Sequence, residues 1–187
     1  AHVIGVVPGG GVGRAADGEA VNTLLEDRTR RVITLTGKGG VGKSTLARGV
    51  AEQAMPQFTD GVYLIELSGI SDAEFVFPTI ALTLGVHDFP GRPVLEDIAS
   101  AIGTDEQLLV LDTFEHVLDA APGLTALVDA CPNLRLIVTS RAALGLRSEA
   151  THEVGPLALP NPKAPLAESE ANPAVQVYVD RVQAAGD

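Results

Sequence analysis

The stretch TGKGGVGKST, at residues 36–45, restricts the fold of this chain more than any other segment. It carries the pattern G-x-x-x-x-G-K-S from Gly37 onward and directly follows the apolar, β-branched run VITL. Glycines allow the backbone to curl until successive N–H groups point inward, where they can surround an anion. Because a strand precedes the glycines and a helical pattern follows, the segment predicts a phosphate-binding loop in an α/β domain.

The rest of the chain alternates short apolar runs with stretches of helical period, which is typical of an α/β domain with a mostly parallel sheet. We expect strands at 32–35, 62–65, 108–111, 134–138 and 152–154. We expect helices around 21–25, over 43–54, from 71 onward and over 95–102. The spacing of Ser71 and Glu74 predicts a capping box, and Pro78 should kink that helix or split it in two.

The composition restricts the binding partners and the cellular compartment that we expect for this chain. The chain has 24 acidic against 13 basic residues, and a net charge of -11 argues against nucleic-acid contact by this segment. No apolar run reaches the roughly 20 residues that span a bilayer, and the first residues do not resemble a secretory signal. Cys131 is the single cysteine and is interpreted as a core residue. A lone thiol fits a reducing compartment, so we expect a cytoplasmic protein.

The 187 residues suffice for one well-packed domain and a fragment of a second. We expect an N-terminal leader over 1–16, a nucleotide-binding domain over 17–160 and a proline-rich linker over 161–173. Residues 174–187 have helical spacing and are interpreted as the first helix of a truncated helical subdomain. The chain therefore reads as a segment of a longer protein.

The glycine-rich loop predicts a site for ATP or ADP with Mg²⁺. Its amide groups would surround the β- and γ-phosphates at the positive end of the following helix. Lys43 would neutralise charge between these phosphates, and the Ser44 hydroxyl would face Mg²⁺. The loop residues expected to bind the nucleotide are Gly37, Lys38, Gly39, Gly40, Val41, Gly42, Lys43, Ser44 and Thr45.

Two further residues follow strands that should end at the same edge of the sheet. Asp112 ends the buried run 108–111, where a carboxylate could hold Mg²⁺ together with Ser44; its alternative role is a helix N-cap. Arg141 follows the next strand, where a guanidinium could detect the terminal phosphate; its alternative is a plain surface arginine.

The sequences LLVLDTFEH and VTSR, the phosphate loop and the stretch PAVQVYVDR together resemble the signal-transduction ATPases with numerous domains. The similarity covers roughly residues 12–183 and is greatest to the bacterial branch in LuxR-type and AfsR-like transcriptional regulators, which are related to NB-ARC switches. The resemblance implies a three-layer P-loop NTPase fold with five strands in the order 5-1-4-3-2. It also implies an ATP/ADP switch with slow hydrolysis, other domains of the same polypeptide as partners, and Val12 and Arg14 beside the adenine.

Three positions depart from the family pattern, which usually has Pro at Lys38, Asn at Thr113 and Gly at Ser148. In NB-ARC relatives the position of Thr113 is often a second aspartate that orients the attacking water, and threonine is no base at neutral pH. Glu115 is the nearby carboxylate that could replace it, although an exposed glutamate at a helix start is an equally ordinary interpretation. We therefore expect tight nucleotide binding with slow or absent turnover.

Two alternatives remain open. Lys38 completes a Lys-Gly-Gly signature that resembles MinD- and ParA-like ATPases, which dimerise around nucleotide, whereas IELSGISDAEF and LDTFEH fit the signalling family better. The chain could also be a nucleotide-responsive scaffold without enzymatic activity. Arg28, Arg30 and Arg31 are interpreted as charges at a helix end.

Overall fold

The computed structural model describes residues 14–157. The predicted linker over 161–173, the predicted helix over 174–187 and Val12 lie outside the described residues. Among the helices that the structure describes, none has both the length and the apolar character needed to cross a membrane.

The described chain alternates strands and helices. The strands are β1 (Val32–Thr36), β2 (Gly61–Glu66), β3 (Gln107–Asp112), β4 (Arg135–Ser140) and β5 (Glu149–Glu153). The α-helices are α1 (Ala15–Glu26), α2 (Lys43–Ala54), α3 (Val76–Leu84), α4 (Val94–Ile102) and α5 (Ala121–Ala130). Three short 3-10 helices are η1 (Met55–Gln57), η2 (Ala73–Phe75) and η3 (Leu118–Ala120).

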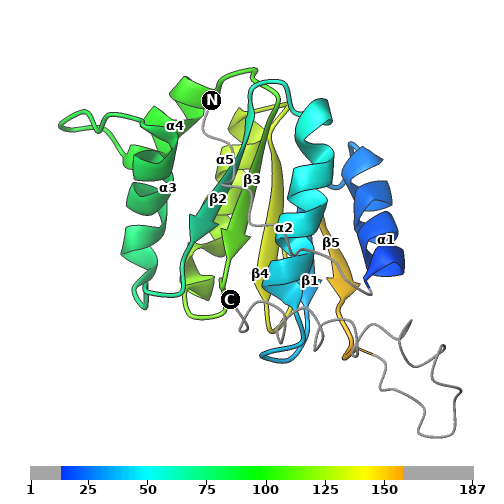
Figure 1. Cartoon of the computed structure of the whole chain (residues 1–187). Helices are drawn as coiled ribbons and strands as arrows, with labels where there is room; N and C mark the ends of the chain where they lie inside the picture. The colour runs from blue at the N-terminus through cyan, green and yellow to red at the C-terminus, as the bar shows by residue number, and fades with distance from the viewer. Residues whose placement is uncertain (1–13, 158–187) are drawn as a thin grey trace, which may run out of the picture.

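The five strands form one sheet in the order β2-β3-β4-β1-β5, and every neighbouring pair is parallel. Read from β5, this is the order 5-1-4-3-2 that the family resemblance implied. All strands point the same way, so their carboxyl ends meet at the lower edge of the molecule in Figure 1. The loop between β1 and α2 lies at this edge, as expected for a ligand site in a parallel sheet.

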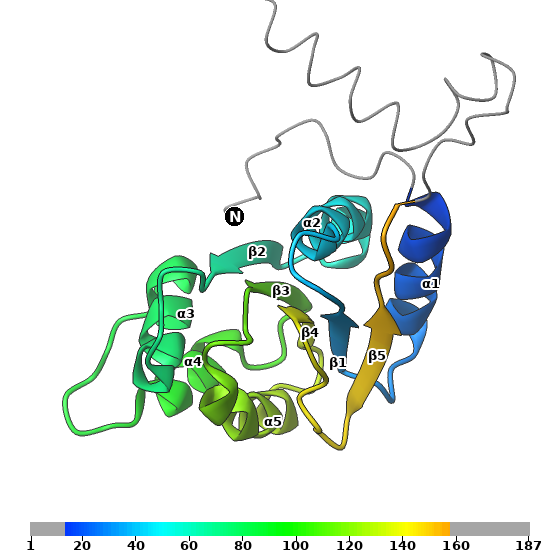
Figure 2. The same ribbon diagram turned by 90° about the horizontal axis from the view of Figure 1, so that it is seen from below.

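Helices cover both faces of the sheet, which gives the predicted three layers. Residues of α1 and α2 pack with one face, whereas α3, α4 and α5 pack on the other. Figure 2, viewed along the strands from the carboxyl edge, shows this arrangement. Every residue of β3 and β4 is buried. Their apolar runs are continuous rather than alternating because both faces of these strands pack against helices.

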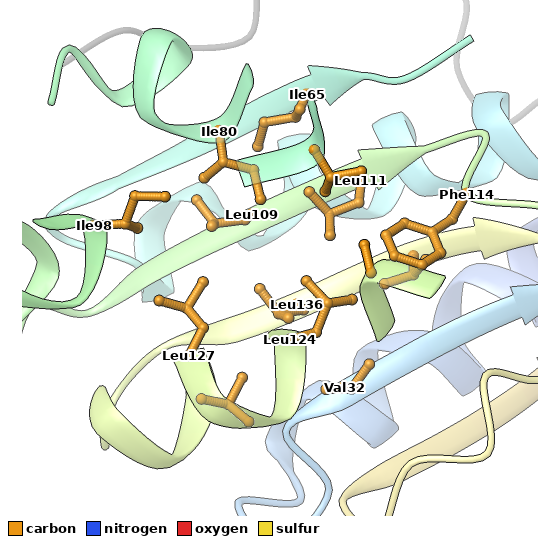
Figure 3. Packing of buried hydrophobic residues seen from close by; sticks show 14 of the residues in the cluster. Val32, Ile65, Ile80, Ile98, Leu109, Leu111, Phe114, Leu124, Leu127 and Leu136 are labelled. Carbon is orange, nitrogen blue, oxygen red and sulfur yellow. The ribbon is translucent and has the colours of Figure 1, made fainter. Parts of the chain in front are cut away.

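Figure 3 shows the core between the sheet and the α3–α5 layer. Leu109, Leu111 and Leu136 of the strands pack in one cluster with helical residues such as Ile80 and Leu124. Phe114, in the turn after β3, is fully buried in the same cluster. It therefore anchors the turn that carries Glu115.

The strands and helices that were predicted within residues 14–157 are present, and some of their boundaries differ from the prediction. The break expected at Pro78 falls earlier, between η2 and α3, because Pro78 occupies the first turn of α3 where a missing N–H costs little. The cap of η2 is Asp72, whose carboxylate accepts from the N–H of Glu74 at 3.0 Å, rather than Ser71.

Two further differences concern the second half of the chain. Helix α5 was not among the predicted elements; it starts beside Pro122 and contains Gly123. β5 begins at Glu149, earlier than expected, because its backbone continues the ladder of β1. Cys131 is a fully buried free thiol in the core, as interpreted, and burial raises its pKa.

Candidate nucleotide-binding site

The phosphate loop depends on glycines at three positions where the backbone has positive φ. These angles are +147° at Gly37, +79° at Gly40 and +100° at Gly42. A Cβ atom added at Gly37 would lie 2.6 Å from the carbonyl oxygen of Val154, so a side chain there would collide with the backbone after β5. The loop conformation therefore requires glycine, as the sequence pattern predicted.

Lys43 is the first residue of α2 and is 8% exposed. Its Nζ donates to the carbonyl oxygens of Gly37 at 2.8 Å and Lys38 at 2.9 Å, so the ammonium lies inside the curl of the loop. Within residues 14–157 no carboxylate forms an ion pair with this ammonium. A buried cation without a counter-charge fits an anionic phosphate group at this position.

Ser44 and Asp112 come together as predicted, although 68 residues separate them in the sequence. The Ser44 hydroxyl donates to Asp112 Oδ1 at 2.6 Å, and the Thr139 hydroxyl donates to the same oxygen at 2.6 Å. Asp112 does not cap a helix, so that alternative is wrong. A hydroxyl beside a carboxylate is a hard oxygen donor set that suits Mg²⁺.

Thr113 follows Asp112 with φ of +68°, in the left-handed region that a β-branched residue rarely adopts. Its N–H donates to Thr139 Oγ1 at 2.8 Å, and the next N–H, of Phe114, donates to the Thr139 carbonyl at 2.9 Å. These bonds hold the strained turn. Asparagine tolerates this conformation better, which gives a physical reason for the residue that the family usually has here.

Glu115 and Arg141 form an ion pair across this edge, with 3.6 Å between Arg141 Nε and Glu115 Oε1. Glu115 lies in a turn and its side chain is 15% exposed, so the interpretation as an exposed glutamate at a helix start is wrong. Its Oε2 is buried and lacks a hydrogen-bond partner among the described residues. The Arg141 side chain is 66% exposed and borders a hollow formed with residues 36–39. A carboxylate and a guanidinium therefore lie together beside the phosphate loop.

Arg48 and Glu66 border the Ser44–Asp112 pair, and sequence reasoning missed both. Arg48 Nη2 lies 2.6 Å from Glu66 Oε1 and 4.0 Å from Asp112 Oδ2. Glu66 ends β2 in register with Asp112 at the end of β3. Glu66 could have been identified from the sequence, because acidic residues end both of the predicted strands that turned out to be neighbours.

Arg14 lies against the phosphate loop, where its Nη2 donates to the carbonyl oxygen of Val41. Its Nη1 bonds Asp17 Oδ2 at 3.1 Å, and Asp17 Oδ1 lies 2.8 Å from His152 Nε2 on β5. This chain of contacts joins α1, the loop and the edge strand. The adenine-side role of Arg14 and Val12 stays a prediction.

The Asp17 contacts predict an acid-dependent contribution to stability. Burial opposes ionisation, but hydrogen bonds from His152 and Arg14 outweigh it and hold the pKa of Asp17 below the usual value of an aspartate. A lowered folded-state pKa stabilises the fold above the unfolded pKa, and this contribution disappears as pH falls through the folded value. Asp17→Asn should therefore cost about 1 kcal/mol in the free energy of unfolding at neutral pH and progressively less below about pH 4.

Urea unfolding of the wild type and of Asp17→Asn between pH 3 and 7 measures this difference. Asp119→Asn, which changes an exposed carboxyl, serves as the control and should stay close to wild type throughout. A gap between wild type and Asp17→Asn that widens on acidification would contradict the assignment.

The sequence matches the NB-ARC domain family over residues 14–146. Two curated relatives come from Mycobacterium tuberculosis. An uncharacterized protein is 35% identical over 173 residues, which cover 92% of this chain and 41% of the relative. A protein named as an HTH-type transcriptional regulator is 34% identical over 152 residues, covering 81% of this chain and 16% of the relative. The chain thus spans less than half the length of these relatives.

A solved structure with the same fold is a signal transduction ATPase with numerous domains that carries a tetratricopeptide repeat sensor, from Pyrococcus horikoshii. The similarity has a TM-score of 0.53 at 18% sequence identity, and it covers 95% of this chain and 28% of that protein. At this identity the likeness concerns the fold alone.

Proposed function

We propose that this chain, which belongs to the NB-ARC domain family, acts as the ATP- or ADP-binding switch of a larger signalling or transcriptional regulator. The observation that carries this proposal is the buried Lys43 ammonium, which lies inside a glycine loop next to the Ser44–Asp112 pair. The glycines and Lys43 would hold the phosphates. Ser44 and Asp112 would hold Mg²⁺, which when bound neutralises phosphate charge.

We propose that Arg141 contacts the terminal phosphate and that Glu115 positions the attacking water. The ion pair between Arg141 and Glu115 supports a link between these two roles. If the guanidinium turned to a phosphate, it would release the carboxylate, which could then position the water. Glu115 is the general-base candidate because Thr113 has no group that accepts a proton at neutral pH. The expected activity is slow hydrolysis that resets the switch.

Calorimetric titration of the chain with ATP and with ADP, each with and without Mg²⁺, tests the central claim. We expect heat of binding with both nucleotides. A folded protein that gives no heat with either nucleotide would remove the basis of the proposal.

Mg²⁺ is expected to increase the affinity for ATP, and Asp112→Asn should make this increase about tenfold smaller. The affinity for ATP in the absence of Mg²⁺ should change little. Asparagine keeps an oxygen that can accept from Ser44 and Thr139 but loses the negative charge that would face the metal. Titrations over a range of Mg²⁺ concentrations measure the effect. Glu153→Gln, at the end of β5 on the same edge, is the control and should keep the wild-type Mg²⁺ dependence. Unchanged Mg²⁺ dependence in Asp112→Asn would contradict the metal assignment.

The partners that we propose are the other domains of the same polypeptide, whose arrangement the nucleotide would bias. The match to a much longer protein that is named as an HTH-type transcriptional regulator supports this context. The buried thiol Cys131 supports a reducing compartment, and cytoplasm remains our prediction. The second candidate, a scaffold that binds nucleotide without hydrolysing it, is favoured by the absence of an aspartate at Thr113.

A further inference from the structure

Thr139 carries a buried hydroxyl to which the proposed function gives no role. It is the next-to-last residue of β4 and is 1% exposed. Strands β3 and β4 pair in register up to Leu111 and Val138, so the next residue of each strand, Asp112 and Thr139, come to lie side by side. Residues in register on neighbouring strands direct their side chains to the same face of the sheet. The register therefore brings the Thr139 hydroxyl to the Asp112 carboxylate.

The hydrogen bonds around Thr139 determine where its proton points. The N–H of Thr113 donates to Thr139 Oγ1 at 2.8 Å, so the hydroxyl oxygen is the acceptor in that bond. A hydroxyl has a single proton, and an ionised carboxylate can only accept. The Thr139 proton therefore goes to Asp112 Oδ1, at an O–O distance of 2.6 Å. Rotation of the Thr139 side chain would break both bonds.

These bonds fix the plane of the Asp112 carboxylate. Its Oδ1 accepts two hydrogen bonds, one from Thr139 and one from Ser44, each at 2.6 Å. Its Oδ2 accepts none from residues 14–157 and lies 4.0 Å from Nη2 of Arg48. Ser44, Arg48 and Asp112 border one hollow at the carboxyl edge of the sheet. Two donors on one oxygen thus leave the other oxygen free on the side of this hollow.

The same carboxylate orients the Ser44 hydroxyl. The single proton of this hydroxyl points to Asp112 Oδ1, so its lone pairs point away from Asp112. A hard cation such as Mg²⁺ binds to oxygen lone pairs. If the carboxylate turned, Ser44 would lose its acceptor and its proton could point toward the cation instead. Thr139 therefore influences both oxygen groups of the proposed metal site, although it does not itself border the hollow.

We propose that Thr139 is a positioning residue for Mg²⁺, which acts by holding the Asp112 carboxylate in the orientation that the cation requires. Thr139 touches neither the metal nor the nucleotide, and its effect passes through Asp112. The inference rests on the proposed function, in which Ser44 and Asp112 hold Mg²⁺ beside the phosphates.

Two substitutions of Thr139 test this role. Thr139→Val keeps the β-branched shape that suits a strand but removes the hydroxyl, whereas Thr139→Ser keeps the hydroxyl. Calorimetric titration with ATP, with and without Mg²⁺, measures the increase in affinity that Mg²⁺ provides. Thr139→Val should make this increase about fivefold smaller, and Thr139→Ser should keep it within about twofold of the wild type. Without Mg²⁺, both variants should bind ATP within about twofold of the wild type.

A double variant tests whether the effect passes through Asp112. Adding Thr139→Val to Asp112→Asn should change the Mg²⁺ dependence by less than about twofold, because the carboxylate that Thr139 orients is already lost. An equal effect of Thr139→Val in the wild type and in the Asp112→Asn background would show that it acts by another route. That result would overturn the positioning role.

Thr34→Val is the matched control. Thr34 lies in β1, is fully buried like Thr139, and its Oγ1 has no hydrogen-bond partner within the described part of the chain. Removing its hydroxyl should leave the Mg²⁺ dependence within about twofold of the wild type. A loss as large as that in Thr139→Val would indicate a general effect of altering the sheet and would overturn the proposal.

Urea unfolding checks that each variant is folded, and Thr139→Ala replaces Thr139→Val if the latter does not fold. A folded variant that lacks the hydroxyl and keeps the wild-type Mg²⁺ dependence would overturn the role of Thr139 but leave Ser44 and Asp112 as the metal site. A wild type that binds ATP equally well with and without Mg²⁺ would instead remove the metal site, and the role of Thr139 with it.

Discussion

Replacing Lys43 by alanine is expected to weaken ATP binding by about 100-fold or more. Lys43 is 8% exposed, and its ammonium lies at hydrogen-bond distance from two carbonyls of the loop. A hydrogen bond to a charged group contributes roughly 1.5–3 kcal/mol, so losing one or two such bonds to phosphate accounts for a factor of this size. Calorimetric titration with ATP and Mg²⁺ measures the loss directly.

Lys38→Ala is the matched control for Lys43→Ala, because it removes a lysine from the same loop whose side chain is exposed. We expect its ATP affinity to stay within about threefold of the wild type. Urea unfolding of both variants separates a binding defect from a folding defect. An affinity loss in Lys38→Ala as large as that in Lys43→Ala would show that charge alone, rather than the buried position, governs binding.

Lys38→Ala also tests the alternative that the chain is a MinD- or ParA-like ATPase, which dimerises around nucleotide. The exposed position of Lys38 at the tip of the loop suits a solvated side chain, yet a lysine here could also reach a second protomer. Gel filtration with a non-hydrolysable ATP analogue distinguishes a solvated Lys38 from one that contacts a second protomer. A nucleotide-dependent dimer that Lys38→Ala abolishes would favour the dimerising ATPase over the switch.

Glu115→Gln is expected to slow single-turnover ATP hydrolysis by about 100-fold while ATP affinity changes by less than about threefold. The Glu115 side chain is held in a turn anchored by the buried Phe114, and its Oε2 is buried without a hydrogen-bond partner among residues 14–157. A buried carboxylate oxygen left without a donor is costly. Glutamine keeps the shape but cannot accept the proton.

Glu153→Gln changes another carboxyl at this edge and should leave the rate of hydrolysis near wild type. Hydrolysis that persists unchanged in Glu115→Gln would show that another group, or none, serves as the base. If the wild type binds ATP but does not hydrolyse it in a single turnover, the scaffold alternative is favoured. Both outcomes leave the nucleotide-binding proposal intact, because Lys43, Ser44 and Asp112 do not depend on the identity of the base.

Much of the site could be read from the sequence because its residues have fixed places relative to strand ends. A parallel sheet brings the carboxyl ends of its strands to one edge, so Asp112 at the end of β3 had to lie near the loop after β1 once both strands joined the sheet. The helix at α5 was missed because Pro122 and Gly123 weaken its local pattern, and it is stabilised by packing of Leu124 and Leu127 on the sheet.

Sequence alone determined the phosphate loop, since glycine adopts the positive φ angles at positions 37, 40 and 42 with little steric cost, and this preference is local. Tertiary structure alone decided which distant groups meet: Thr139 on the Asp112 carboxylate and Arg141 on Glu115. The reason is physical. Backbone conformation depends on neighbouring residues, whereas contacts between side chains depend on strand register and helix packing that no short segment specifies.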